Sequence, residues 1–159
     1  MPHKVADSIF QFNSPGPRPN GLQAADDGLW IIDQANDLVH KVDWATGEVL
    51  HEVPTETDKS SGITLGGGYL WIASTYSCEI FQVDIETGKT IEIYPGAGVG
   101  INATREKLDE TSGRHSQPTG DHGLEWKDGK LYVASPPSQY LHVIDTENWQ
   151  EIHRMKLPG

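Results

Sequence analysis

The chain has 159 residues, with 12 Lys or Arg against 23 Asp or Glu, and its formal net charge is −11. Nucleic acids and anionic membranes are unfavourable partners for such a surface, because both are polyanions. A cationic ligand or a metal ion is compatible with it, as is a simple role in solubility. One cysteine, Cys78, excludes an intrachain disulfide and a zinc site built from cysteines.

No apolar segment follows the N-terminal residues in the way a signal peptide requires. No apolar run approaches the length of a membrane span. We therefore expect a soluble chain, and its compartment stays open. Residues 5–15, with Ile9, Phe10 and Phe12 ahead of Pro15, predict a lone outer strand that belongs to a missing blade.

Three similar units follow. Each begins with a polar residue, a glycine and an aliphatic residue. A tight turn then leads into a strand with a central aromatic residue, and a second apolar strand that ends at an Asp follows. Gly21 and Gly62 lie 41 residues apart, the length of one β-propeller blade. The units cover residues 18–54 (blade 1), 60–95 (blade 2) and 122–158 (blade 3), with an insertion over residues 96–121.

Each unit predicts four strands, A to D. Asp27-Gly28 and its counterparts provide the positive φ that the A–B hairpin turn needs. Strand C ends at an Asp that we interpret as a turn cap, and Thr-Gly follows it in blades 1 and 2. Asn148-Trp149 replaces Thr-Gly in blade 3, where Asn148 tolerates the left-handed region. We interpret the aromatic residues of strand B as packing between blades: Trp30, Trp71 and Tyr132.

The sequence thus predicts an all-β chain: a β-propeller fragment of three four-stranded blades plus one N-terminal outer strand. Closed propellers have about four to eight blades, so three span too little of a circle. We expect a fragment in preference to a half-ring that dimerises. The open blade faces should then self-associate or bind the missing remainder of the propeller, because they expose apolar surface.

The motifs Pro19-Asn20-Gly21-Leu22, Gly28–Asp33 and Val42-Asp43-x-x-Thr46-Gly47 resemble the propeller superfamily of virginiamycin B lyase. Gluconolactonase-type (SMP-30) and NHL- and YVTN-repeat proteins belong to the same superfamily. The resemblance covers residues 18–158. It implies either an enzyme, a lyase or lactonase-type hydrolase acting on a small molecule at the axial face, or a non-catalytic scaffold that binds a ligand or a protein.

Candidate site residues lie where the copies differ at the axial face, formed by the D–A connectors and B–C loops. Asn20, Ser61 and His122 each precede the repeated glycine. His122 is the catalytic candidate, because imidazole titrates near neutral pH and serves as a general base or a metal ligand. The alternative is a polar lining of a wet channel. In the lyase branch, the resemblance implies axial His and acidic residues with a divalent metal, although Asp121 replaces the expected Pro before His122.

Asn20, Asp33 and His122 would together form a mixed oxygen and nitrogen site for one divalent ion, Mg²⁺ or Ca²⁺. Asp33-x-x-Asn36 is also an ordinary turn pair, which we favour. Ser135 is the counterpart of Asp33 in blade 3, and no Gly-x-Ser-x-Gly motif surrounds it, so we expect no serine nucleophile. The remaining ligand-binding candidates are Ser61, Asp121, His115 and Ser135.

The insertion at 96–121 replaces a short connector on the axial face. Asn102 is a candidate N-cap for a helix over residues 102–108. The segment is either a binding loop, with Asp109, Arg114 and His115 as candidates, or a tolerated surface insertion. Gly96-Ala97-Gly98-Val99-Gly100 resembles a dinucleotide loop, but its third glycine falls one position early and no βαβ unit surrounds it. We expect neither a nucleotide nor a haem.

Overall fold

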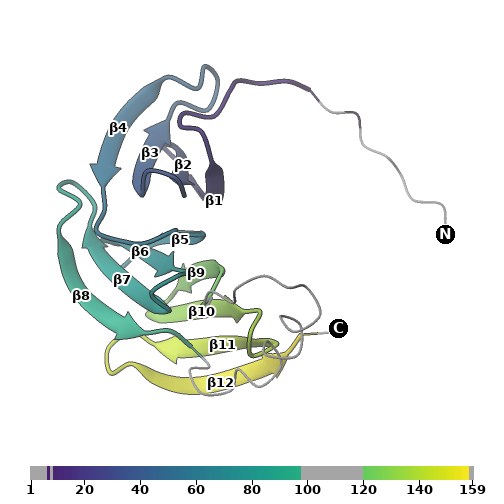
Figure 1. Ribbon diagram of the computed structural model, residues 1–159, viewed down its shortest axis with the longest axis vertical. Helices are drawn as coiled ribbons and strands as arrows, with labels where there is room; N and C mark the ends of the chain where they lie inside the picture. Colours follow the sequence, from purple (N-terminus) through teal and green to yellow (C-terminus); the bar gives the residue numbers. More distant parts are fainter. Residues whose placement is uncertain (1–6, 8, 98–119, 158–159) are drawn as a thin grey trace, which may run out of the picture.

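The computed structural model describes residues 7, 9–97 and 120–157. Within these residues, twelve strands form three antiparallel four-stranded sheets, in each of which consecutive strands are hydrogen-bonded neighbours. The three sheets stand side by side in an arc (Figure 1). The expected all-β fold of three propeller blades is confirmed. No helix of the described residues is long and apolar enough to cross a bilayer.

Blade 1 consists of β1 (Pro19–Ala25), β2 (Gly28–Asp33), β3 (Leu38–Val42) and β4 (Val49–Pro54). Blade 2 consists of β5 (Gly62–Gly66), β6 (Tyr69–Ser74), β7 (Glu79–Asp84) and β8 (Thr90–Pro95). Blade 3 consists of β9 (Gly123–Lys127), β10 (Lys130–Ser135), β11 (Tyr140–Asp145) and β12 (Gln150–Lys156). The inner strand β5 contacts both β1 and β9, while β4, β8 and β12 form the convex side of the arc (Figure 1).

The repeated glycine permits this close approach of the inner strands. A Cβ atom on Gly21 would collide with the carbonyl oxygen of Ser61, and one on Gly62 would collide with that of His122. Any other residue at these two positions would therefore push neighbouring blades apart. At Gly123 a Cβ would meet, among the described residues, the Ala134 Cβ at 3.4 Å and no backbone of another blade, since no described blade follows blade 3.

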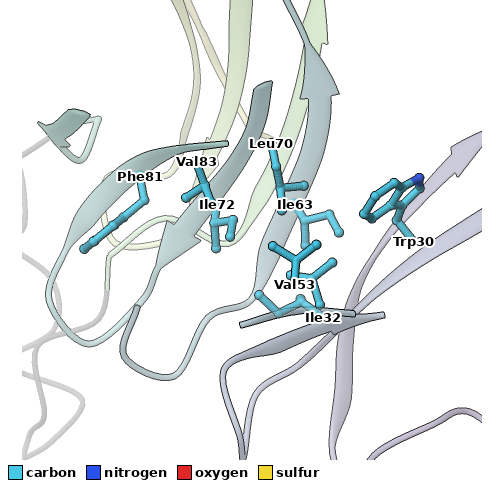
Figure 2. Close-up of a cluster of buried hydrophobic side chains, with 9 residues drawn as sticks. Trp30, Ile32, Val53, Ile63, Leu70, Ile72, Phe81 and Val83 are labelled. Carbon is cyan, nitrogen blue, oxygen red and sulfur yellow. The ribbon is translucent and has the colours of Figure 1, made fainter. Parts of the chain in front are cut away.

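Aromatic residues of strand B fill the interfaces between blades. Trp30 is 3% exposed and packs with Ile63 and Leu70 of blade 2 in a mostly aliphatic cluster (Figure 2). Trp71 is 2% exposed and packs in the same way with Leu131 of blade 3. The interpretation of these two residues as inter-blade packing is confirmed. Their counterpart Tyr132 is only half-buried and lies on the face of blade 3 that no other described blade covers, called here the free face.

The C–D turns follow the expected Asp-capped pattern. Asp43 Oδ1 accepts hydrogen bonds from the backbone N–H and the hydroxyl of Thr46, and Asp84 does the same with Thr87. Gly47 has the left-handed φ of 72° that this turn requires.

Blade 3 departs from the expectation at this turn, because the left-handed residue is Trp149, with φ of 55°, and not Asn148. A left-handed non-glycine residue costs about 1–2 kcal/mol. Here the Trp149 ring stacks on Tyr94 of blade 2 at 3.9 Å between centroids, and its indole N–H donates to Pro95 O at 3.2 Å. Packing against the neighbouring blade thus offsets the backbone strain.

The outer strand expected over residues 5–15 is not formed in the described part of that segment. This strand is expected on a blade that is absent from the described residues, so no strand edge is present there for the segment to pair with. Gln11 Nε2 instead donates to Ala45 O at the C–D turn, and the Arg18 N–H donates to Asp33 Oδ2 at the other end of the blade. The segment therefore crosses the free face of blade 1, on which Ile31 is 2% exposed.

We predict that Trp71→Ala lowers the free energy of unfolding by about 3–5 kcal/mol, because it leaves a cavity between blades 2 and 3. Tyr132→Ala is the matched control at the same blade position, and we expect it to cost less than half as much because Tyr132 is half-exposed. Urea denaturation followed by circular dichroism measures both. Equal losses would show that the face bearing Tyr132 is covered in solution.

Candidate functional site

The inner ends of the blades carry the three residues that precede the repeated glycine. The backbone N–H groups of Ser61 and His122 donate to Ala73 O and Ala134 O, at 3.1 and 3.0 Å, so these residues occupy equivalent positions. Asn20 and His122 have exposed side chains. The Asn20 amide donates to Ser60 O at 3.4 Å, which holds this side chain beside the next blade.

Ser61 differs from Asn20 and His122 because its side chain turns into the wall between blades. It is 5% exposed, and its hydroxyl lies 2.5 Å from the Thr75 hydroxyl. Both hydroxyls also lie 3.3 Å from Asp121 O. The expected axial trio is therefore reduced to Asn20 and His122, and Ser61 joins a buried polar cluster.

This cluster at the junction of blades 2 and 3 contains three of the expected ligand-binding residues: Ser61, Asp121 and Ser135. Asp121 is 2% exposed, and its Oδ2 accepts the Ala97 N–H at 2.7 Å. Ser135 is equally buried and donates to Ala97 O at 3.3 Å. Asp121 Oδ1 is buried without a hydrogen-bond partner among the described residues. A buried acceptor in this state is unusual and suits a water molecule or the donor of a ligand.

Burial raises the pKa of Asp121 to about 6, while the Ser135 side chain, the Ala97 N–H and the neighbouring His142 only partly oppose this shift. A carboxyl group of this kind can take up or release a proton close to neutral pH. Asp121 is therefore the described residue whose protonation state is best placed for acid–base chemistry.

Asp33 is occupied by the backbone. Its Oδ1 accepts the N–H groups of Ala35 and Asn36 at 2.9 and 3.0 Å, and its Oδ2 accepts the Arg18 N–H at 2.6 Å. The carboxylate thus organises the B–C loop, as the turn interpretation expected. The described residues contain no group of three or more His, Cys, Asp or Glu side chains arranged for a metal ion.

The ends of the insertion are held at the same junction. Gly96 N–H donates to Cys78 O at 3.0 Å, and Gly120 N–H donates to Thr75 O at 2.7 Å. Both ends therefore rest on the B–C loop of blade 2. The candidates Asp109, Arg114 and His115, and the expected helix over residues 102–108, lie outside the described residues.

Sequence reasoning missed a hydrogen-bonded series in blade 3 formed by Ser138, His142 and Glu151. His142 Nε2 lies 2.8 Å from Ser138 Oγ, and Nδ1 lies 2.6 Å from Glu151 Oε2. This connectivity is that of a Ser-His-acid triad. Ser138 is 6% exposed, however, and its hydroxyl also donates to Ser135 O at 3.1 Å, so the series holds the B–C loop. His142 occupies the repeat position of buried Phe81, and a buried imidazole needs such partners.

No protein-family model and no curated protein matches the sequence. Solved structures do match it. Hydrazine synthase of Kuenenia stuttgartiensis matches 96% of this chain and 39% of its own chain, with 18% identity and a TM-score of 0.59. Glutaminyl cyclase of Myxococcus xanthus matches 88% and 51%, with 10% identity and a TM-score of 0.59. A streptogramin B lyase structure matches 84% and 38%, with 17% identity and a TM-score of 0.54.

These likenesses show the propeller fold. The chain spans only about two-fifths to one-half of the length of the matched structures. The three blades therefore correspond to an arc of larger proteins.

We predict that Asp121→Asn removes a pH dependence of stability. The folded protein holds the Asp121 proton up to about pH 6, whereas the unfolded chain releases it near 3.8. This carboxyl group therefore contributes stability below the lower value, and the contribution is lost as the pH rises through the upper one. Asn cannot ionise and still accepts the Ala97 N–H.

Urea midpoints from about pH 4 to about pH 7 measure the effect, which is at most about 3 kcal/mol. Exposed carboxylates with lowered pKa, such as Asp43, change stability in the opposite direction, so the informative quantity is the difference between variant and wild type. A difference that is constant over this range would contradict the assignment.

Proposed function

We propose that the chain supplies three blades of a larger β-propeller that binds a small molecule at its axial face. The observation that carries this proposal is the pair of exposed polar side chains, Asn20 and His122, at the inner ends of blades whose innermost strands contact one another in series. Polar groups that converge on a propeller axis from several blades are suited to orienting a small ligand. The net charge of −11 supports a ligand that is neither nucleic acid nor membrane.

In the enzymatic form of this proposal, a lyase or a lactonase-type hydrolase, His122 acts as general base at the rim. A divalent ion, Mg²⁺ or Ca²⁺, would bind at Asn20 and His122 with further ligands from blades outside this chain, because Asp33 is committed to its loop. The non-catalytic alternative is a scaffold for a ligand or a protein. The inward turn of the Ser61 hydroxyl favours that alternative, because it removes one polar group from the rim.

We also propose that another propeller blade covers the free face of blade 3. Tyr132, Ala134 and Leu141 on this face are half-buried. Their counterparts in blade 2 are fully covered by blade 3, with exposures of 2% for Trp71 and 0% for Ala73 and Ile80. A partner surface that resembles the face of blade 3 packed on Trp71 would complete this burial. A second copy of the chain or the remainder of the propeller would supply it.

For the axial site, we predict that His122→Ala abolishes metal binding and lowers any ring-opening activity by about 10²–10⁴-fold, while the melting temperature stays close to that of wild type. Calorimetric titration with Mg²⁺ and Ca²⁺ measures binding. Mass spectrometry on small lactones and streptogramin B measures turnover, with hydrolysis adding one water and elimination leaving the mass unchanged. His153→Ala, on the exposed outer strand β12, is the control. Unchanged binding and turnover in His122→Ala would overturn the axial-histidine assignment.

For the free face, we predict that the isolated chain self-associates and that Tyr132→Arg shifts it toward monomer, because the charge cannot be buried in a blade interface. Sedimentation velocity measures the distribution. Leu22→Arg, at a 61% exposed position on blade 1, serves as the control and should change little. A wild-type chain that is monodisperse, monomeric and cooperatively melting would contradict the proposed interface.

A further inference from the structure

A cleft of about 410 Å³ lies between blades 1 and 2, at the end of the blades opposite to Asn20 and His122. It is bounded by the A–B turn of blade 1 and the C–D turn of blade 2. Its volume lies within the range of small-molecule sites, about 300–1,000 Å³. The cleft wall is formed by Asp27, Trp30, Lys41, His51, Leu65, Ile85 and Glu86.

The corresponding space between blades 2 and 3 is filled by aromatic side chains. Trp126 covers Gly66 so closely that a Cβ there would collide with the indole, and Trp149 stacks on Tyr94. Between blades 1 and 2 the residues at these three aromatic positions are smaller. Leu65 replaces Trp126, Gly88 replaces Trp149 and Val53 replaces Tyr94. Of these three positions only Leu65 lies at the cleft wall, since Gly88 packs against the Pro54 carbonyl and Val53 is fully buried, so the cleft is left open where Leu65 stands in place of Trp126.

Trp30 brings an unsatisfied hydrogen-bond donor to this cleft. In blade 2 the equivalent Trp71 N–H donates to Gly66 O at 3.0 Å. In blade 1 the equivalent acceptor, Ala25 O, is taken by the Trp44 N–H at 3.0 Å, and the buried Trp30 Nε1 has no partner among the residues that the structure describes. The Trp30 nitrogen lies on the side of the ring away from the aliphatic cluster (Figure 2). Leaving such a donor buried and unpaired is unfavourable.

Charge divides the cleft into two polar walls. On blade 1 the Lys41 ammonium lies 5.5 Å from the Trp30 ring centroid and 2.6 Å from Asp27 Oδ2. The hydrogen bond from Lys41 lowers the pKa of Asp27, so this pair stays ionised. On blade 2 no ion pair to Glu86 is present within the described residues. Leu65 and Ile85 supply apolar surface along the same cleft.

We propose that this cleft binds a small zwitterion with an apolar side group, the chemistry of a free hydrophobic amino acid. The carboxylate accepts from the Trp30 N–H and the Lys41 ammonium, the side group lies on Leu65 and Ile85, and the ammonium pairs with Glu86. One carboxylate has acceptors for both donors, and binding would satisfy the indole N–H that folding leaves unpaired. This site is separate from the axial face and does not depend on the function proposed there.

The test uses three probes that separate the two walls: L-phenylalanine, 3-phenylpropionate, which lacks the amine, and phenethylamine, which lacks the carboxylate. Two-dimensional ¹H–¹⁵N NMR of the full chain follows the indole signals, with Trp30 assigned from the Trp30→Phe spectrum. We expect a saturable downfield shift of the Trp30 N–H with L-phenylalanine, a weaker one with 3-phenylpropionate and none with phenethylamine. A Trp30 signal that none of the probes moves would overturn the proposal.

Glu86→Gln is the diagnostic variant, and we expect it to weaken L-phenylalanine binding about tenfold, the loss of one charge-assisted hydrogen bond, while leaving 3-phenylpropionate unaffected. Glu147→Gln changes the same turn position in blade 3, where aromatic rings fill the space, and should have no effect. Equal losses in the two variants would assign the effect to net charge and overturn the site.

A second variant fills the cleft. Leu65→Trp combined with Ala25→Gly copies the arrangement of Trp126 over Gly66, and we expect it to abolish the shift while retaining the circular dichroism spectrum of wild type. Should this variant fail to fold, the Glu86→Gln and Glu147→Gln pair decides the question. Binding that persists in a folded, filled variant would place the ligand elsewhere.

Discussion

Blades 1 and 2 each bury their aromatic-bearing face against the following blade, and the rest of the structure depends on that contact. A single four-stranded sheet has two broad faces and cannot bury both within itself. Trp30 and Trp71 are nearly inaccessible because blades 2 and 3 cover them. The inner strands approach closely enough for this only because Gly21 and Gly62 carry no side chain. The arc in Figure 1 is the geometric result of repeating one interface.

The three blades could be predicted from the sequence because the residues that form each turn and each contact between blades recur at constant spacing. An Asp before Thr-Gly identified the C–D turn, and a Trp at constant spacing identified the inter-blade layer. Asp33 was also correctly favoured as a turn residue, since Asx-type turns are local and leave a local signature. The outer strand over residues 5–15 stays a prediction, because it belongs to a blade outside the described residues and a strand forms only against a partner edge.

The candidate site was only partly predictable, for the same reason. The position of Ser61 before Gly62 placed it at the inner rim, but its rotamer depends on Thr75 and on the backbone of Asp121, which are distant in sequence. The burial of Asp121 likewise follows from the packing of two blades. Trp149 shows the limit of prediction from local sequence most clearly. A tryptophan in the left-handed region contradicts local preference and is explained by its stack on Tyr94.

The two hydrogen bonds that fasten Gly96 and Gly120 to the B–C loop of blade 2, together with the Asp121–Ala97 bond, have an evolutionary consequence. They bring two points of the chain together independently of what lies between them. The entropic cost of closing a loop grows only slowly with its length. The fold can therefore accept segments of very different length between Gly96 and Gly120, because the strand register of the adjoining blades does not depend on that length.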